Sequence, residues 1–171
     1  KRQEQTIGSD QVYTIYRDSR DRMWFGTLSG ALTLLDPSET NRIGKTSFKT
    51  FGDKEGYPAK LTLCITEDKN KNIWFGTFDS GIFKYDGNTF KNYSTKDGLS
   101  SNTPYLLTCD DKNNLWIGTG LGIDRFNLKD ETLKHYEKED GFLGVEINPN
   151  AVCKDKAGAL WFGSIIGLVK Y

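Results

Sequence analysis

A tryptophan motif recurs four times along the chain and sets the architecture that the chain can adopt. The motif is Trp, then Phe or Ile, then Gly, then Thr or Ser, and it begins at Trp24, Trp74, Trp116 and Trp161. Successive tryptophans are 50, 42 and 45 residues apart. An aspartate lies six residues before each of them, at Asp18, Asp68, Asp110 and Asp155. Repeats of about 40 to 50 residues with several short strands each are typical of β-propeller blades.

Within each repeat the residues predict four short strands separated by turns. In the second repeat, residues 61–65 alternate in polarity like a half-buried strand, and residues 68–72 make a polar turn of Asp, Lys and Asn. The tryptophan strand follows, with a glycine where a neighbouring backbone can approach closely. Residues 81–85 form the third strand. The fourth strand carries paired apolar side chains, which are Phe48 and Phe51, Phe90 and Tyr93, and Leu133 and Tyr136.

No segment has a sustained period near 3.6 residues, so we expect almost no helix. The sequence predicts an all-β fold: a β-propeller segment with four blades of four short antiparallel strands. We expect one domain over residues 1–171. Blade 1 is predicted at about 11–60, blade 2 at about 61–102, blade 3 at about 103–147, and blade 4 at about 148–171 together with 1–7.

The last blade is the one that the sequence leaves incomplete. The fourth repeat reaches Tyr171 after its third strand. Residues 1–7 could pair with that blade and close a ring, which would leave no open sheet edge. Two alternatives stay open here: a slice of a larger propeller, or a homodimer in which two chains complete one ring.

Composition excludes several classes of function. Lys plus Arg and Asp plus Glu both number 23, and this balance predicts no attraction to nucleic acid or to an anionic membrane. Cys64, Cys109 and Cys153 form no C-x-x-C pair, and His135 is the single histidine, so we predict no disulfide framework, no metal site and no cofactor. No stretch is apolar over 18 residues, so we expect no membrane helix in this chain. The polar residues 1–5 predict that a signal peptide is either absent or already removed.

The repeat resembles a known family. Residues 155–163, Asp-Lys-Ala-Gly-Ala-Leu-Trp-Phe-Gly, and residues 97–100, Asp-Gly-Leu-Ser, are similar to the two-component-regulator propeller repeat. Residues 146–152 resemble the terminal blade that precedes a triple-tyrosine β-sandwich. The resemblance implies the C-terminal part of the periplasmic sensor propeller of a Bacteroidetes-type hybrid histidine kinase. It also implies further blades and signalling modules as partners, and an oligosaccharide as the ligand.

Two features invite a binding function and are better explained by structure. A tryptophan at the same strand position in every blade is a packing element, with its N–H satisfied locally. Residues 68–72, with Asp79 at the twelfth position, partly follow the spacing of a calcium-binding EF-hand loop. Ile73 stands where that loop needs glycine, so we predict a hairpin turn and no metal.

An enzyme finds little support in the sequence. His135 lies on a predicted outer strand, where a catalytic base would face away from the central channel. Arg17, Arg20 and Arg22 gather in one turn and do not converge on a substrate carboxylate. We therefore predict no catalytic residue in this chain.

Residues that depart from the repeat are the better candidates for function, because repetition serves the scaffold. Loops between second and third strands, and those that lead into first strands, lie on one face of a propeller. On that face we predict a ligand site made of Phe78, Asp79, Asn102, Tyr105, Glu146, Asn148 and Asn150. Amides, carboxylates and aromatic rings suit sugar hydroxyls and sugar faces. The alternatives are asparagines that only cap strands, a protein–protein interaction propeller, and, third, an enzyme.

Overall fold

The computed structural model describes residues 7, 11–28, 32–40, 46–59, 61–140 and 146–171. These residues form fifteen strands in four antiparallel sheets. Helix is limited, in the described ranges, to three short 3-10 turns, η1 (Asp53–Glu55), η2 (Thr95–Asp97) and η3 (Lys138–Asp140). The all-β prediction is confirmed.

Each sheet is one blade, and its strands are hydrogen-bonded in chain order. Blade 1 contains β1 (Val12–Arg17), β2 (Met23–Thr27), β3 (Leu32–Thr40) and β4 (Thr46–Phe51). Blade 2 contains β5 (Thr62–Glu67), β6 (Ile73–Thr77), β7 (Ile82–Tyr85) and β8 (Phe90–Tyr93). Blade 3 contains β9 (Leu106–Cys109), β10 (Asn114–Thr119), β11 (Gly122–Asn127) and β12 (Thr132–Tyr136). Blade 4 contains β13 (Ile147–Lys154), β14 (Leu160–Ser164) and β15 (Gly167–Lys170).

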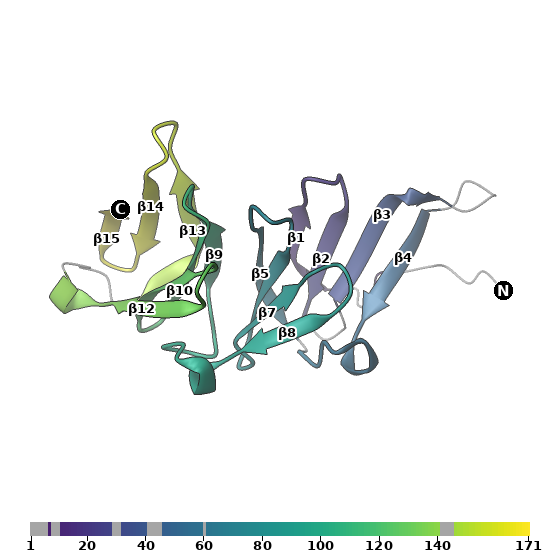
Figure 1. Cartoon of the computed structure of the whole chain (residues 1–171), viewed down its shortest axis with the longest axis horizontal. Coiled ribbons are helices and arrows are strands. Elements are labelled where there is room, and N and C mark those ends of the chain that lie inside the picture. Colours follow the sequence, from purple (N-terminus) through teal and green to yellow (C-terminus); the bar gives the residue numbers. More distant parts are fainter. Residues whose placement is uncertain (1–6, 8–10, 29–31, 41–45, 60, 141–145) are drawn as a thin grey trace.

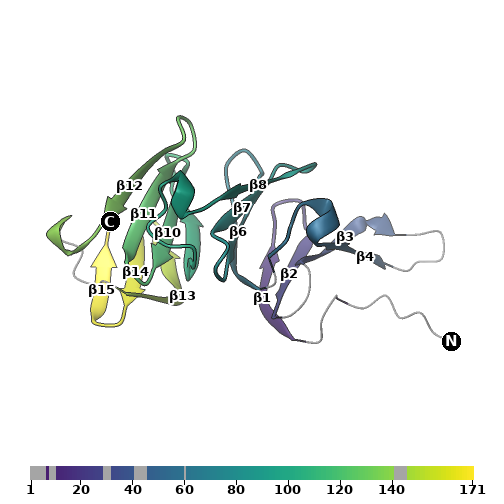
Figure 2. The same ribbon diagram turned by 90° about the horizontal axis from the view of Figure 1, so that it is seen from below.

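The four blades stand side by side in a row, as propeller blades do (Figures 1 and 2). The first strand of each blade contacts the first strand of the next, so β1, β5, β9 and β13 form the inner edge of the row. Blade 4 has three strands among the described residues. The predicted pairing of residues 1–7 with blade 4 involves positions outside the described residues, apart from Ile7, and stays a prediction.

An aspartate fixes both a turn and a tryptophan in every blade. In blade 2, Oδ1 of Asp68 accepts hydrogen bonds from the backbone N–H groups of Asn70 (2.8 Å) and Asn72 (3.0 Å). Its Oδ2 accepts the indole N–H of Trp74 at 2.9 Å. The same indole bond measures 2.8 Å in blade 1, 3.0 Å in blade 3 and 2.9 Å in blade 4. Both oxygens of the carboxylate thus accept hydrogen bonds from the turn and from the tryptophan. These bonds account for the fixed Asp-to-Trp spacing, and no bound cation is needed to explain it.

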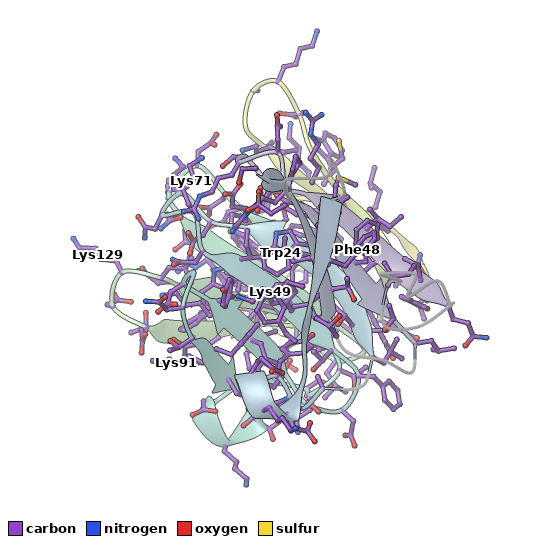
Figure 3. The ribbon with its side chains drawn as sticks, turned by 90° about the vertical axis from the view of Figure 1, so that its right-hand side faces the viewer. Trp24, Phe48, Lys49, Lys71, Lys91 and Lys129 are labelled. Atoms are coloured by element: carbon purple, nitrogen blue, oxygen red, sulfur yellow. The ribbon has the colours of Figure 1, made fainter. Side chains whose placement is uncertain are left out.

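The core lies between blades, where the tryptophan of one blade packs on the next. Trp24 meets the ring of Phe75 edge-on, with ring centroids 5.3 Å apart, and Trp116 contacts Phe162 at 5.8 Å. Trp74 packs against Phe126 of blade 3 at 5.9 Å. Figure 3 shows Trp24 enclosed within the row of blades, while lysines such as Lys71 and Lys129 project from its rim. Apolar burial between blades, with these ring contacts, holds the row together.

The strand β5 differs from its prediction. Alternating Leu and Thr predicted one exposed face, whereas five of its six residues are buried. Blades 1 and 3 cover its two faces, so Ile65 belongs to the core with Trp24 and Leu63 to the core with Trp74. The buried hydroxyl of Thr62 has a partner inside the protein: it shares a hydrogen bond of 2.7 Å with the hydroxyl of Tyr57.

The motif glycine allows this dense packing between inner strands. A Cβ on Gly118 would lie 2.7 Å from the side chains of both Leu106, on its own blade, and Ile147, on the next. We expected a neighbouring backbone to approach this glycine closely. The atoms next to Gly118 belong instead to the side chains of Leu106 and Ile147. A methyl group at this position would push adjacent blades apart.

Candidate binding face

The row of blades has two faces with different chemistry. One, here the aspartate face, carries the turns that contain Asp18, Asp68, Asp110 and Asp155. Polar bonds link these turns from blade to blade: the hydroxyl of Ser19 donates to Glu67 at 2.8 Å, and Lys154 pairs with Asp111 at 2.9 Å. The opposite face, here the hairpin face, carries the β2–β3, β6–β7, β10–β11 and β14–β15 hairpins and the connections into β5, β9 and β13.

The hairpin face contains an apolar hollow of about 240 Å³. Its lining comes from three blades and from the start of β13, and consists of Tyr13, Leu61, Leu63, Phe78, Tyr105 and Pro149. Tyr13, Leu63 and Tyr105 are equivalent positions, each five residues before the aspartate of its repeat. They therefore lie next to one another on neighbouring inner strands, at the end of each strand that meets the hairpin face.

Backbone hydrogen bonds hold the walls of the hollow. The N–H of Phe78 donates to the carbonyl of Leu61 at 3.1 Å, which ties the β6–β7 hairpin to the segment before β5. The N–H of Tyr105 donates to Gly118 at 2.7 Å, and the carbonyl of Tyr105 accepts the N–H of Asn150 at 3.0 Å. The hollow is thus held by hydrogen bonds within the protein and is largely pre-formed.

The structure brings Phe78 and Tyr105, of the seven predicted ligand residues, into the hollow itself. Asp79 is exposed beside Phe78, with its N–H bonded to the hydroxyl of Thr103 at 3.1 Å. Glu146, Asn148 and Asn150 are exposed around Pro149, within or just before β13.

Asn102 has a different position from the rest of the predicted set. Its side-chain oxygen accepts the N–H of Thr95 at 2.8 Å, and its carbonyl accepts the N–H of Gly81 at 2.8 Å. The side chain thus forms a hydrogen bond within the connection between blades 2 and 3. Four lining residues were not predicted: Tyr13, Leu61, Leu63 and Pro149. Aligning the repeats on their aspartates would have found Tyr13 and Leu63, because both occupy the register of Tyr105.

Exposed apolar side chains mark the tips of the hairpins. All four blades carry at least one, and these residues are Leu28, Phe78, Leu121, Ile165 and Ile166. Ile166 is 68% exposed and Phe78 is 59% exposed. Single exposed apolar residues are ordinary, but here they recur at the same place in all four blades.

His135 lies on the outer strand β12, as expected, and has a polar partner. Its Nδ1 lies 2.7 Å from Oδ1 of Asp124, a carboxylate that is 1% exposed. The other oxygen of Asp124 accepts the N–H of Ser100 at 2.8 Å and its hydroxyl at 2.9 Å. The carboxylate sits between the histidine and the serine, so His135 is not placed to take the proton of Ser100. The described residues contain no group of three or more His, Cys, Asp or Glu side chains suited to a metal ion.

A family model matches three of the repeats, at residues 6–29, 56–79 and 98–120; its description is two-component regulator propeller. The three matched segments contain Trp24, Trp74 and Trp116 with their aspartates. A curated relative, Histidine kinase P4 of Formosa agariphila, is 29% identical over 167 residues. The match covers 97% of this chain and 12% of the relative, so the chain spans about an eighth of that protein.

Solved structures establish the propeller fold of this chain. The extracellular domain of the putative hybrid two-component system BT3049 from B. thetaiotaomicron is similar with a TM-score of 0.82 and 22% identity, over 98% of this chain and 22% of that one. Virginiamycin B lyase from Staphylococcus aureus is similar with a TM-score of 0.63 and 17% identity, over 96% of this chain and 56% of that one. In the described part of the chain no helix has the length and apolar character needed to cross a bilayer.

Proposed function

We propose that this chain is a ligand-sensing part of the periplasmic propeller of a two-component receptor, and that the ligand is an oligosaccharide. The observation that carries the proposal is the apolar hollow on the hairpin face. The faces of the Tyr105 and Phe78 rings suit the apolar C–H faces of sugar rings. Asp79 and the Asn148 and Asn150 amides stand nearby to accept and donate hydrogen bonds to sugar hydroxyls.

The aromatic residues at the hollow support a binding role for it. Inner-strand packing is served by aliphatic Leu63 in blade 2, whereas blades 1 and 3 have tyrosine at the same register. Tyr13 is 49% exposed, so its ring is not required to fill the core. Large aromatic side chains held half-exposed at a concave site are available to a ligand.

The periplasmic location and the receptor context follow the similarity to an extracellular two-component domain and to a histidine kinase. In that context this chain detects, and modules elsewhere in the receptor carry any kinase activity.

Further blades of the receptor are the partners that the packing favours. Trp24, Trp74 and Trp116 are each at most 2% exposed because the next blade covers them. Trp161 is less buried, and Lys170 lies over its ring with its Nζ 4.9 Å from the centroid. A blade of the same repeat would cover this ring as blade 2 covers Trp24. A second copy of this chain, as a homodimer, offers the same surface.

A protein-interaction propeller is the second candidate, and the apolar hairpin tips are the observation that favours it. A propeller lyase is the third. The Asp124–His135 pair is its nearest approach to catalytic chemistry, and the order of the groups around Asp124 argues against it.

The test is a titration of the purified chain with a panel of oligosaccharides, followed by thermal shift and calorimetry. Specific binding should raise the melting temperature, because a ligand that binds the native state stabilises it. Phe78→Ala should weaken binding about fivefold, the value of roughly 1 kcal/mol of ring contact. Ile166→Ala, at another exposed hairpin tip, is the matched control and should not weaken it. Equal losses in both variants would mean that the hollow is not the sugar site, and no binding of any sugar would favour the protein-interaction alternative.

A further inference from the structure

The charge around the apolar hollow selects among sugars, an inference that rests on the proposed function. Asp79 follows Phe78 directly in the sequence, and Glu146 lies three residues before Pro149. Both side chains are exposed. The lining residues carry no formal charge at neutral pH. The described residues that form and border the hollow therefore offer two carboxylates and no cation.

The loops of the hairpin face extend this imbalance. Seven described carboxylates stand on them, against three lysines. The acidic residues are Asp53, Glu55, Asp79, Asp97, Glu137, Asp140 and Glu146, and the basic residues are Lys54, Lys96 and Lys138. On the aspartate face, the four turns between first and second strands hold equal numbers of acidic and basic residues. The acidic residues are Asp18, Asp21, Asp68, Asp110, Asp111 and Asp155, and the basic residues are Arg20, Arg22, Lys69, Lys71, Lys112 and Lys156. The β7–β8 and β11–β12 turns of the aspartate face add Asp86, Asp130 and Glu131 against Lys129. The described excess of carboxylates is therefore larger on the hairpin face, at four, than on the aspartate face, at two.

Among the described residues around the hollow, no cation would compensate the charge of an acidic sugar. Proteins bind carboxylates and sulfates with paired arginines, lysines or converging backbone N–H groups. Around the hollow, the N–H groups of Phe78, Asp79, Tyr105 and Asn150 already donate within the protein. An anion here would lose its hydration and lie near two carboxylates.

We infer that the apolar hollow selects uncharged oligosaccharides over acidic or sulfated ones. A neutral sugar places its apolar face on Phe78 and Tyr105 and its hydroxyls toward Asp79 and the amides of β13. Carboxylates are good acceptors for neutral hydroxyls, so the same groups that repel an anion orient a neutral sugar. The preference follows from charge, and it should weaken with added salt.

The experiment compares matched ligands that differ in charge. Hexaoses of glucose, mannose and galactose are titrated into the chain, each beside the same hexaose with its C6 hydroxyls oxidised to carboxylates. For any neutral hexaose that binds, the oxidised form should bind at least tenfold more weakly at 20 mM salt, and the gap should narrow at 500 mM. The substitutions Asp79→Asn and Glu146→Gln should also reduce the difference in affinity between the neutral and the oxidised hexaose. Asp21→Asn is the matched control: Asp21 and Asp79 are both exposed, with φ of 63° and 60°, but on opposite faces.

The outcomes separate the two proposals. Equal or tighter binding of the oxidised sugars to the unmodified chain would overturn the charge selection and leave oligosaccharide sensing standing. A gap that Asp21→Asn narrows as much as Asp79→Asn does would also overturn it, since the charge would act over the whole molecule. Failure of every sugar to bind would remove the proposed function and the selection with it.

Discussion

The indole N–H of Trp116 donates a 3.0 Å hydrogen bond to Oδ2 of Asp110, six residues earlier in the chain. The same carboxylate accepts the side-chain amide of Asn114 at 2.8 Å and the backbone N–H groups of Lys112 and Asn114 through Oδ1. One buried carboxylate thus satisfies four donors, which couples the turn to the core between blades 3 and 4.

Replacing Asp110 by Asn should lower the free energy of unfolding by about 1–3 kcal/mol. The new amide N–H₂ would face donors, so at least one buried group would lose its partner. Urea unfolding followed by tryptophan fluorescence measures the change. The adjacent Asp111→Asn is the control: it breaks an exposed pair with Lys154 and should cost less than about 1 kcal/mol. Similar losses in both variants would contradict the role given to Asp110.

Acid should destabilise the chain through these carboxylates. Burial acts to raise the pKa of Asp18 and of Asp110. Hydrogen bonds to each carboxylate, from its tryptophan and from backbone and side-chain groups of its turn, outweigh burial, so both pKa values lie below the ordinary 3.8. At Asp155 the Trp161 bond is the main cause of a lowered pKa. The unfolded chain therefore binds protons more readily, and the contribution to stability is present above about pH 4 and lost as the pH falls through the lower native values. Urea unfolding from pH 7 to 2.5 should show this fall, and a shallower one in Asp110→Asn.

Gly118→Ala should cost about 1–3 kcal/mol of stability, because its Cβ would lie 2.7 Å from both Leu106 and Ile147. Gly167→Ala is the matched control, since a Cβ there meets nothing within 4 Å. Thermal and urea unfolding of the two variants compare them directly. If Gly118→Ala were as stable as the control, the blades would not be in such close contact.

The three cysteines should differ in their reactivity. Cys153 is exposed, whereas burial raises the pKa of the Cys109 thiol to about 12 and raises that of Cys64 as well. Because the thiolate is the reactive form, iodoacetamide at pH 8 should modify Cys153 first. Mass spectrometry of the digested protein measures the order. Labelling of Cys64 as fast as Cys153 in the native chain would mean that blades 2 and 3 separate readily.

The fold was predictable because its determinants are local and repeated. The Asp-to-Trp spacing and the Asp- and Asn-rich turn occur within ten residues, so each blade could be identified from its own sequence. The burial of β5 on both faces was not predictable from alternation, because it depends on blades 1 and 3 together.

The candidate site was predictable only in part. Phe78 was found because its turn is longer than the same turn in the other repeats, and Tyr105 because it lies in a loop that leads into a first strand. Tyr13, at the register of Tyr105, could have been found from the repeat, whereas Pro149 joins these residues through the packing of neighbouring blades. Asn102 was selected for its residue type, and its amide oxygen proved to be engaged by Thr95. The polarity of a loop residue does not by itself show whether its side chain is free to contact a ligand or already hydrogen-bonds to the backbone of its own loop.

The packing of Trp24, Trp74 and Trp116 on the following blade also bears on how such a chain grows. A blade brings a tryptophan for its successor and a complementary apolar face for its predecessor, as blade 2 does with Trp74 and Phe75. A duplicated blade inserted between any two others would therefore find a matching neighbour on both sides. Gene duplication can lengthen the row without inventing a new interface, and the loops of the hairpin face are then free to diverge.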